Sequence, residues 1–536
     1  MSGVVVPGFA TSRKTPGVFL NVILGGAASS PAASPIKILL MGNKSAAISV
    51  SSPTLALPAG TIAVNTPIAL ASEDDAATYF GLGSEVHVMA RAVFAQYPDA
   101  TLYGIAVAEA GTAGDVICTF ANAATAAYAI RVRACGYTFD VSVASGDSIA
   151  TIVTALCNAV NAVTWLPFYA QFSTGAVTFT AKNTGPRGND LAVLLSFVSS
   201  SGTETPITTS STTSPGATTG IMSGGNASGN QYRFAGGATQ DDFTNALSAI
   251  VPTRYNRIVG ACTDSTNIGL ISAHVTAQAA VTVQKREQAI VATIASSGTA
   301  ITLATGVNNA RMQVAWHYNS PMPPCMIAAQ VCAARVIGDA FVGGLLPGEA
   351  SNPDANLSGL QLATIPAQLN VDDEPTATEI ESALNNGLAV LAASGARPGF
   401  TSLVLSCTSL SLVNGLQNYA VLFTGYPTTC DYVADGEQAN LGVRYAGYRL
   451  GANDANGDPP KAALVTTAQQ IRASISADLK GYEAEGIIGF VDANDPLLVV
   501  EANALVPGRV DMDIPVSPLP WLTILAGNIR QVPPTL

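Results

Sequence analysis

The sequence predicts a multidomain protein of mixed α/β and α+β class: a discontinuous α/β core with a ββαβββ insertion and terminal β-strand arms. Three observations support this prediction. Apolar runs alternate with helix-capping residues along most of the chain, the spacing of apolar residues changes between residues 127 and 198, and each end carries a short β-rich run beside a tether. At 536 residues the chain has room for about three or four domains.

The N-terminal run Val18–Leu24 places apolar residues at every second position, which is the pattern of a half-buried strand. Pro16 precedes this run and cannot donate a backbone hydrogen bond, so it marks the start or the edge of the strand. Residues 25–34 are rich in Gly, Ala and Ser and predict a flexible tether. A tethered strand needs a sheet, and that sheet belongs either to its own chain or to a neighbouring one.

The first part of the core is predicted to be a βαβ unit, with strands at Ile36–Met41 and Leu102–Ala108. Between these strands, Ser72 and Ser84 each precede a helical pattern, and a serine hydroxyl at this position accepts a hydrogen bond from the first turn. Three acidic residues follow Ser72, where the positive end of the helix dipole favours them.

A compact ββαβββ pattern comes next and predicts an insertion into the core. Its hairpin turns at Cys135-Gly136 and its helix starts at Ser148. Its strands are expected at residues 127–133, 137–143, 168–172, 177–181 and 191–198. The stretch 199–230 is rich in Ser, Thr and Gly without apolar periodicity, so it predicts a linker or a long exposed loop.

Strand–helix alternation resumes after Gly236-Gly237 and predicts the second part of the core. Its helices are expected at residues 240–250 and 267–284, and its strands at 257–262, 289–295 and 312–316. Thr376 and Glu379 have the spacing of a capping box, which predicts another helix start. Beyond Arg397 the pattern predicts a strand at 403–406, a helix near 463–482 and short strands at 497–501 and 509–514.

The C-terminal end mirrors the N-terminal one. Pro515, Pro518 and Pro520 predict a stiff extended spacer, and Trp521–Leu525 is another short β-rich run. Both ends are therefore candidate tethered strands.

Composition excludes several classes of protein. The chain is 48% hydrophobic and 11% charged, yet its longest apolar runs fall far short of the ~20 residues that span a bilayer. A formal net charge of −12 argues against a nucleic-acid partner, which would need clustered Lys and Arg. A cleaved signal peptide is not expected, because Pro16, Gly17 and Asn21 interrupt the apolar run that follows Arg13-Lys14.

The eight cysteines contain no C-x-x-C motif and most lie in apolar segments, so buried thiols in a reducing compartment are expected. They are Cys118, Cys135, Cys157, Cys262, Cys325, Cys332, Cys407 and Cys430.

No pattern in the chain predicts an enzyme. His87, His274 and His317 are far apart in apolar segments, where structural roles are expected. The run Gly42-Asn43-Lys44-Ser45 lacks the upstream glycine of a phosphate loop, and Asp454–Asp458 lacks the glycine of a calcium loop. No G-x-S-x-G motif is present. The sequence therefore predicts no catalytic residue, no cofactor or cofactor-binding residue, and no metal ligand.

Several stretches are shared with a known family. They are Pro16–Leu20, Ile38–Lys44, Ala76–Ser84 with its Y-F-G-x-G-S pattern, Val177–Lys182, Gly185–Asn189, Gly236–Ala238, Thr376–Gly387 and Pro507–Asp511. Through these stretches the chain resembles contractile-tail sheath proteins of bacteriophages, in particular the Mu-like sheath family. The likeness extends over most of the chain and is loosest after Arg397.

The resemblance implies a structural polymer. Sheath subunits stack helically around a tail tube and shorten on triggering, which drives the tube through the host envelope for genome ejection. The implied partners are further copies of the chain, the tail tube protein, and the baseplate and tail terminator proteins, with no nucleic acid and no direct membrane insertion. The implied location is the virion tail, assembled in the host bacterial cytoplasm.

The resemblance also implies that the terminal strands are exchanged between subunits. The implied arm residues are Val18, Phe19, Leu20, Val22, Leu24, Trp521, Leu522, Ile524, Leu525 and Ile529, and the implied hinges are Gly25, Gly26, Pro515 and Pro518. The predicted segments are 1–34 (N-terminal arm and linker), 35–112 (first part of the α/β core), 113–232 (inserted outer domain plus flexible loop), 233–396 (second part of the core), 397–514 (C-terminal inner sheath domain) and 515–536 (C-terminal arm).

Three alternatives to a sheath subunit stay open. A tail tube or baseplate component is one, because the resemblance implies that the ββαβββ module recurs in such proteins. A secreted or surface-layer protein is another, since low charge and Ser/Thr-rich loops are also typical of that class. A sugar- or nucleotide-dependent α/β enzyme would need a ligand-binding glycine loop, which the sequence does not contain.

Overall fold

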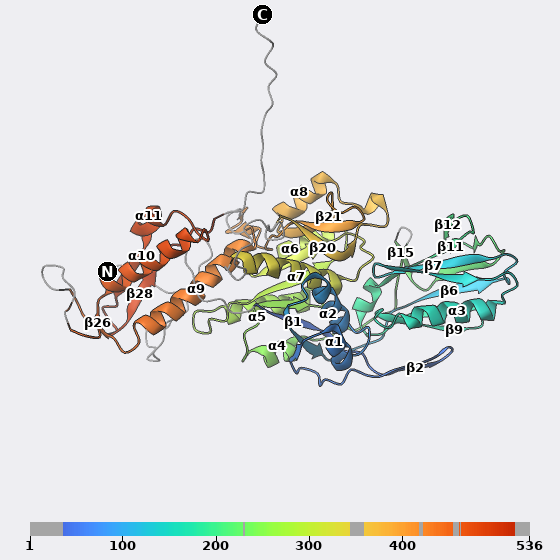
Figure 1. Ribbon diagram of the computed structural model, residues 1–536, viewed down its shortest axis with the longest axis horizontal. Helices are drawn as coiled ribbons and strands as arrows, with labels where there is room; N and C mark the ends of the chain where they lie inside the picture. Colours follow the sequence, from blue (N-terminus) through green and yellow to red (C-terminus); the bar gives the residue numbers. More distant parts are fainter. Residues whose placement is uncertain are drawn as a thin grey trace, which may run out of the picture.

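The computed structural model describes residues 36–228, 231–342, 358–417, 422–453, 460 and 462–519. It shows an elongated molecule with three parts in a row (Figure 1). An α/β core lies in the middle, a β-rich part built from residues 115–233 lies at one end, and a mainly helical part that begins with α9 (Gly425–Arg444) lies at the other. The predicted mixed class with several sheets is confirmed at this level.

The core is a nine-stranded sheet whose strand order is β20-β22-β21-β19-β18-β17-β1-β5-β4. The strands are β1 (Lys37–Asn43), β4 (Ile68–Leu70), β5 (Thr101–Val107), β17 (Arg257–Gly260), β18 (Gln288–Thr293), β19 (Met312–Trp316), β20 (Ser358–Pro366), β21 (Leu388–Ala393) and β22 (Phe400–Leu405). The strands from β21 to β5 in this order run parallel, and β4 and β22 join antiparallel. Every residue of β17, β18 and β19 is buried, as expected for a parallel sheet that helices cover on both faces.

Two hydrophobic clusters hold the helices against the two faces of this sheet. One face is covered by α1 (Glu73–Phe80), α2 (Glu85–Gln96) and α7 (Pro324–Val342). The other is covered by α4 (Thr244–Ile250), α5 (Ser265–Gln278), α6 (Ser297–Val307) and α8 (Ala377–Asn385).

The predicted helix caps are confirmed. Ser72 and Ser84 precede α1 and α2, and each hydroxyl accepts a hydrogen bond from the backbone N–H three residues on. Thr376 and Glu379 form a reciprocal capping box at the start of α8. The core sheet continues past residue 396, where the second part of the core was expected to end. The strand β22 lies beyond that residue and pairs with both β21 and β20.

The β-rich part consists of two sheets and one long helix, α3 (Ile149–Ala162). One sheet has the order β13-β14-β6-β10-β9, and the other has the order β15-β16-β11-β7-β8 with β12 beside β11. The bounds are β6 (Asp115–Ala121), β7 (Tyr128–Ala134), β8 (Tyr137–Val143), β9 (Phe168–Ser173), β10 (Ala176–Ala181), β11 (Ala192–Val198), β12 (Glu204–Pro206), β13 (Thr212–Thr213), β14 (Thr219–Ser223), β15 (Asn226–Ser228) and β16 (Gln231–Arg233).

The structure differs from the predicted loop over residues 199–230. Four short strands, β12 to β15, lie in this stretch, and β14 pairs with β6 along its whole length. The inward positions of β14 are Gly220 and Met222, so only one of them is a large apolar residue. The neighbouring strand therefore stabilises this segment, which has no strong apolar alternation of its own.

The C-terminal part has a small hydrophobic cluster of its own. It contains α9, α10 (Ala468–Ala484), α11 (Val491–Asn494), and two two-stranded sheets: β25 (Arg449–Leu450) with β26 (Val465–Thr466), and β27 (Val499–Ala502) with β28 (Val510–Asp513). No helix among the described residues is long and apolar enough to cross a membrane.

Candidate functional site

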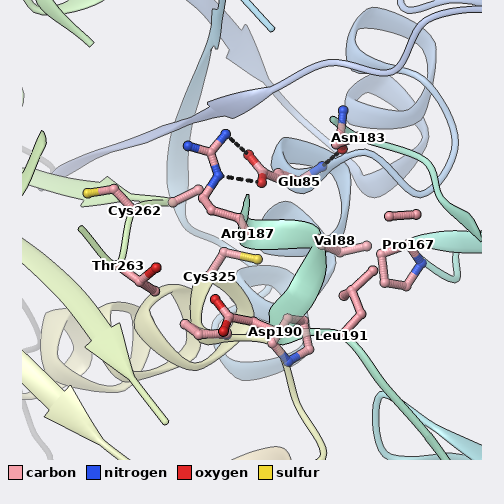
Figure 2. A pocket seen from close by; sticks show the side chains of 15 residues that line it. Glu85, Val88, Pro167, Asn183, Arg187, Asp190, Leu191, Cys262, Thr263 and Cys325 are labelled. Atoms are coloured by element: carbon pink, nitrogen blue, oxygen red, sulfur yellow. Dashed lines mark hydrogen bonds and ion pairs between the residues drawn. The ribbon is translucent and has the colours of Figure 1, made fainter. Parts of the chain in front are cut away.

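The crevice at the carboxyl ends of β1 and β17 is the place where an open α/β sheet binds ligands, because the strand order reverses there. In this chain the short 3-10 helix at Pro186–Asp190 enters that crevice from the β-rich part. Arg187 of this helix donates to both carboxylate oxygens of Glu85, at 2.7 and 3.0 Å (Figure 2). It also pairs with Asp241. All three side chains are buried, so the protein's own arginine occupies the position of a ligand.

Further donors complete this buried cluster. The backbone N–H of Asn43, at the end of β1, donates to Glu85 at 2.8 Å, and its side-chain amide donates to Asp241 at 2.9 Å. The backbone N–H of Ala110 donates to Asp241 at 2.6 Å. A buried ion pair keeps its charges only when such partners satisfy them, so the cluster is a specific joint between the core and the β-rich part.

A cavity of about 30 Å³ lies beside Arg187, with Asp190, Cys262 and Cys325 in its lining. This volume suits about two water molecules. Burial raises the pKa of Asp190 to about 6, although Arg233 and Arg187 oppose the shift. Among the described residues, no three His, Cys, Asp or Glu side chains come together to hold a metal ion.

Lys182 ties the β-rich part to the core at a second point. Its ammonium group donates to the backbone carbonyls of Leu82 at 3.1 Å and Thr164 at 2.7 Å. Burial lowers the pKa of Lys182 to about 7.

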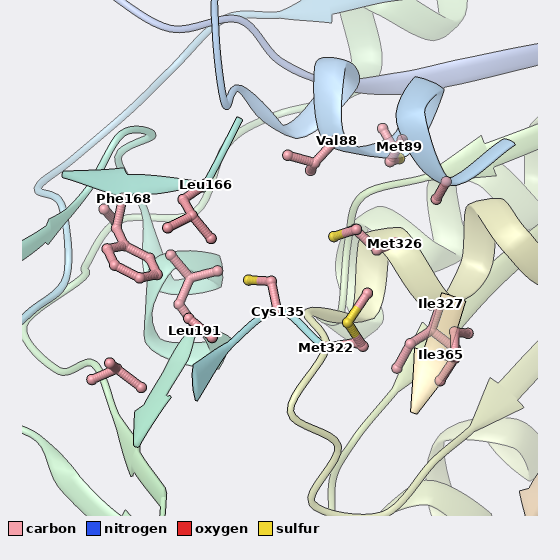
Figure 3. Packing of buried hydrophobic residues seen from close by; sticks show 14 of the residues in the cluster. Val88, Met89, Cys135, Leu166, Phe168, Leu191, Met322, Met326, Ile327 and Ile365 are labelled. Atoms are coloured by element: carbon pink, nitrogen blue, oxygen red, sulfur yellow. The ribbon is translucent and has the colours of Figure 1, made fainter. Parts of the chain in front are cut away.

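Apolar packing continues across the same joint. Cys135 sits at the β7–β8 turn with a φ of 49°, and Figure 3 shows it between Leu191 of the β-rich part and Met322 of the core. One hydrophobic cluster includes residues from both parts. The core and the β-rich part are therefore one packed body.

The three histidines are not brought together. His87 accepts a hydrogen bond from the backbone N–H of Gly83 at 2.8 Å, His317 contacts the Ser320 hydroxyl at 2.8 Å, and His274 lies 3.2 Å from a carboxylate oxygen of Glu287. Burial lowers the pKa of His87 to about 4 and that of His317 to about 3. Each histidine therefore has a separate local contact in the fold.

The cysteines and the Gly42–Ser45 run also have structural placements. All eight cysteines are free; Cys325 is half-buried and the other seven are buried. Burial raises the pKa of Cys135 and Cys332 to about 12, which opposes thiolate chemistry. Lys44 donates to the carbonyls of Gly60 and Ile62.

The joint between the core and the C-terminal part is ionic rather than apolar. It lies at the amino ends of the parallel strands, where Arg311 pairs with both carboxylate oxygens of Asp431 on α9, at 2.8 and 2.9 Å. Next to it, Arg257 at the start of β17 donates to Asp339 on α7 at 3.0 Å. Arg257 also donates to the hydroxyl of Thr428 on α9 at 3.1 Å. Because Arg311 and Asp431 are buried, their pairing fixes how α9 leaves the sheet.

Most of the exposed large apolar side chains among the described residues lie in the C-terminal region. Ten of the seventeen exposed large apolar side chains found among the described residues lie after residue 411. They are Leu412, Val413, Leu416, Val443, Tyr448, Leu464, Phe490, Leu497, Leu505 and Leu519. They lie on several elements, from the β23–β24 hairpin (Leu412–Val413 with Leu416–Gln417), which bonds to the core, to Leu519 at the end of the described chain. They are therefore candidate contact residues rather than one defined patch.

Phe490 is the most informative of these side chains. It is 66% exposed although it is aromatic, and its φ of 62° lies in the left-handed region that non-glycine residues rarely adopt. Nothing in the sequence around Gly489-Phe490 signals this conformation, so sequence reasoning missed it.

The implied arm residues from Val18 to Leu24 and from Trp521 to Ile529 lie outside the described residues, as do the hinges Gly25 and Gly26. Pro515 and Pro518 are described. Pro518 forms a β-bridge with Ile488, and the carbonyl of Ser517 accepts from Gly489 at 3.0 Å. The C-terminal segment thus leaves the described structure beside Phe490.

No protein-family model matches the chain, and no curated protein sequence matches it significantly. Among solved structures, the sheath tail protein of Desulfitobacterium hafniense is 12% identical, with a TM-score of 0.42 over 90% of this chain and 93% of that one. The sheath tail protein of Listeria innocua is also 12% identical, with a TM-score of 0.43 over 89% of this chain and 90% of that one. At this identity and these TM-scores, the likeness by itself assigns no function to the chain.

Proposed function

We propose that this chain is a structural subunit of a phage contractile tail sheath. In this proposal the subunits polymerise helically around a tail tube by exchange of terminal β-strands, and the polymer contracts to drive the tube through the host envelope. The partners are further copies of the chain, the tube protein, and the baseplate and terminator proteins. The chain then belongs to the virion tail and assembles in the bacterial cytoplasm.

The observation that carries the proposal is the set of ten exposed large apolar side chains after residue 411. Full burial of an apolar side chain is worth roughly 1.5–3 kcal/mol. The ten side chains are 41–83% exposed, so covering half of them would contribute on the order of 4–9 kcal/mol per subunit, before the entropic cost of association. These side chains stay exposed to water in a free subunit, whereas contacts between subunits in a polymer would bury them.

The small sheets support the proposal further. Within the described residues, the sheet of β27 and β28 has two strands of four residues each, and an isolated two-stranded sheet is only marginally stable. Strands added by neighbouring copies would complete it. The arm sequences Val18–Leu24 and Trp521–Leu525 have the apolar character that such strands need. A head-to-tail contact of this kind extends into a helix when its rotation does not close a ring.

A non-enzymatic role agrees with the site chemistry. Arg187, Glu85 and Asp241 fill the crevice where an α/β enzyme would bind its ligand. The energy for contraction would come from a lattice that relaxes into one with more buried interface, so no nucleotide is required.

Negative-stain electron microscopy of the purified full-length chain, over a series of concentrations at moderate salt, tests the proposal. Hollow tubes or striated rods above a critical concentration are expected. Flat two-dimensional arrays would favour a surface-layer protein, and short closed rings would favour another tail component. Globular particles that stay small on concentration would refute the proposal.

A further inference from the structure

The tripeptide Asn-Gly-Leu occurs at two described places whose surroundings differ. One copy, residues 386–388, connects α8 to β21, and the other, residues 414–416, forms the turn of the β23–β24 hairpin. An asparagine before glycine is prone to lose its side-chain nitrogen as ammonia, because glycine has no side chain to shield its backbone nitrogen. Since the same two residues follow both asparagines, a large difference in their reactivity has to come from the fold.

Hydrogen bonds and packing hold the Asn386 step in place. The side-chain amide of Asn386 donates to the carbonyl of Ser382 at 2.7 Å, and the backbone N–H of Gly387 donates to the carbonyl of Leu384 at 3.1 Å. Gly387 is buried, and a Cβ atom placed on it would lie only 2.8 Å from the backbone of Ser409. The amide carbon and the backbone nitrogen therefore cannot approach each other without breaking these contacts.

The Asn414 step lacks these restraints. Asn414 and Gly415 are exposed, and their φ values of 52° and 77° are those of a type I′ hairpin turn. The side chain of Asn414 forms no hydrogen bond with any described residue, and no described atom lies within 4 Å of a Cβ atom placed on Gly415. The strands β23 and β24 have two residues each, and so short a ribbon opens locally at little cost. The Gly415 nitrogen is therefore free to reach the Asn414 side chain.

We propose that Asn414 is a site of spontaneous deamidation in the folded chain, whereas the fold protects Asn386. The backbone nitrogen of Gly415 attacks the side-chain amide carbon of Asn414, and the new C–N bond closes a five-membered succinimide ring. The side-chain nitrogen leaves as ammonia and carries away the proton of the Gly415 nitrogen. Water then adds to either carbonyl of the ring and opens it to aspartate or isoaspartate. One water is consumed and one ammonia is released, so the step needs no oxidant and no enzyme.

The modification changes both the charge and the backbone of the hairpin. Residues 398–430 contain no charged side chain, so the new carboxylate is the only charge in this stretch. It lies within two residues of Leu412, Val413 and Leu416, which are 43%, 42% and 74% exposed. Isoaspartate also lengthens the main chain by one carbon atom, so a two-residue turn no longer fits the pairing of Leu412 with Gln417. Conversion to isoaspartate is therefore expected to open the hairpin.

Timed incubation of the full-length chain at pH 8 and 37 °C, followed by mass spectrometry of proteolytic fragments, tests the inference. The mass increase from amide to carboxyl is expected at Asn414 at least about tenfold faster than at Asn386, which corresponds to a difference of about 1.4 kcal/mol in the free energy of local opening. In the same chain unfolded in urea, the two asparagines should react at similar rates. A methyltransferase that modifies only isoaspartate then distinguishes this product from aspartate.

Limited digestion with chymotrypsin supplies a second readout. The base of the hairpin is anchored, because Asn308 accepts from the backbone N–H of Leu412 at 3.1 Å and Gln417 donates to the carbonyl of Asn385 at 3.2 Å. Cleavage within the hairpin should become faster as isoaspartate accumulates. The matched control is N414G, which removes the amide and keeps a residue that suits the type I′ turn. Its hairpin should be cleaved at the same rate before and after incubation.

The inference does not depend on the proposed function. The incubation uses dispersed protein, checked by electron microscopy, so that contacts between copies do not shield the hairpin. Equal rates at Asn414 and Asn386 in the folded chain would overturn the inference, as would an unmodified Asn414 over a time in which the unfolded chain reacts. If Asn414 reacts but chymotrypsin cleaves the modified and unmodified chains alike, the opening of the hairpin is overturned and the deamidation site stands.

Discussion

Replacement of Arg187 by alanine should be the most damaging single change at the joint between the core and the β-rich part. It would leave Glu85 and Asp241 buried without their cation, and removal of one partner from a buried ion pair typically costs about 3–5 kcal/mol. The donors from Asn43 and Ala110 remain, so we expect the lower end, about 3 kcal/mol. Arg187 also lies over the Phe243 ring at 5.6 Å, and that contact is lost as well.

Urea unfolding followed by tryptophan fluorescence measures this loss, because Trp316 is buried in β19 of the same core. The matched control is R444A, which removes an ion pair between Arg444 and Asp478 on the exposed side of α9. That arginine is 40% exposed, so we expect a loss below about 1 kcal/mol. If R187A destabilises the protein no more than R444A does, the buried cluster does not hold the two parts together.

Two further predictions concern Lys182 and Phe490. Lys182 has a pKa of about 7 in the fold and 10.5 as a free side chain, so between these pH values the unfolded chain binds the extra proton and stability should rise with pH. The rise in the urea midpoint from pH 7 to pH 9 should therefore be larger for the wild type than for K182M. Equal rises in the two proteins would contradict the lowered pKa of Lys182. The variant F490N should keep or raise the urea midpoint, because asparagine adopts left-handed backbone more readily, while the critical concentration for polymerisation rises several-fold. Unchanged polymerisation of F490N would exclude Phe490 from the interface.

Local sequence chemistry predicted the helix starts well. Ser72, Ser84 and Thr376 cap their helices as expected, because a cap depends on residues within one turn. The apolar strand β1 was also predictable, since a central parallel strand is a short continuous apolar run.

Elements stabilised by distant partners could not be predicted in this way. The α9 helix contains Gly425, Pro427 and several acidic residues, and its buried Asp431 depends on Arg311, 120 residues away. The α7 helix is buried almost all round, so it has no polar face from which a helical period could be recognised. Strand β14 depends on pairing with β6 in the same way.

The candidate site likewise combines a feature that local sequence predicts with contacts that depend on distant residues. The Gly185–Asn189 turn was predictable from its residues, but Arg187 acts through Glu85, 102 residues away, and Asp241, 54 residues away. No local pattern links these three positions. The set of exposed apolar side chains after residue 411 also required the fold, because exposure depends on what neighbouring elements leave uncovered.

The central claim is that the terminal arms join subunits into a helical polymer. Electron microscopy of the full-length chain beside a variant lacking residues 1–24, at equal concentration and salt, tests it most directly. The account predicts tubes for the full-length chain and folded, dispersed particles for the variant, with matching circular dichroism spectra. Tubes of normal appearance from the truncated variant would contradict it.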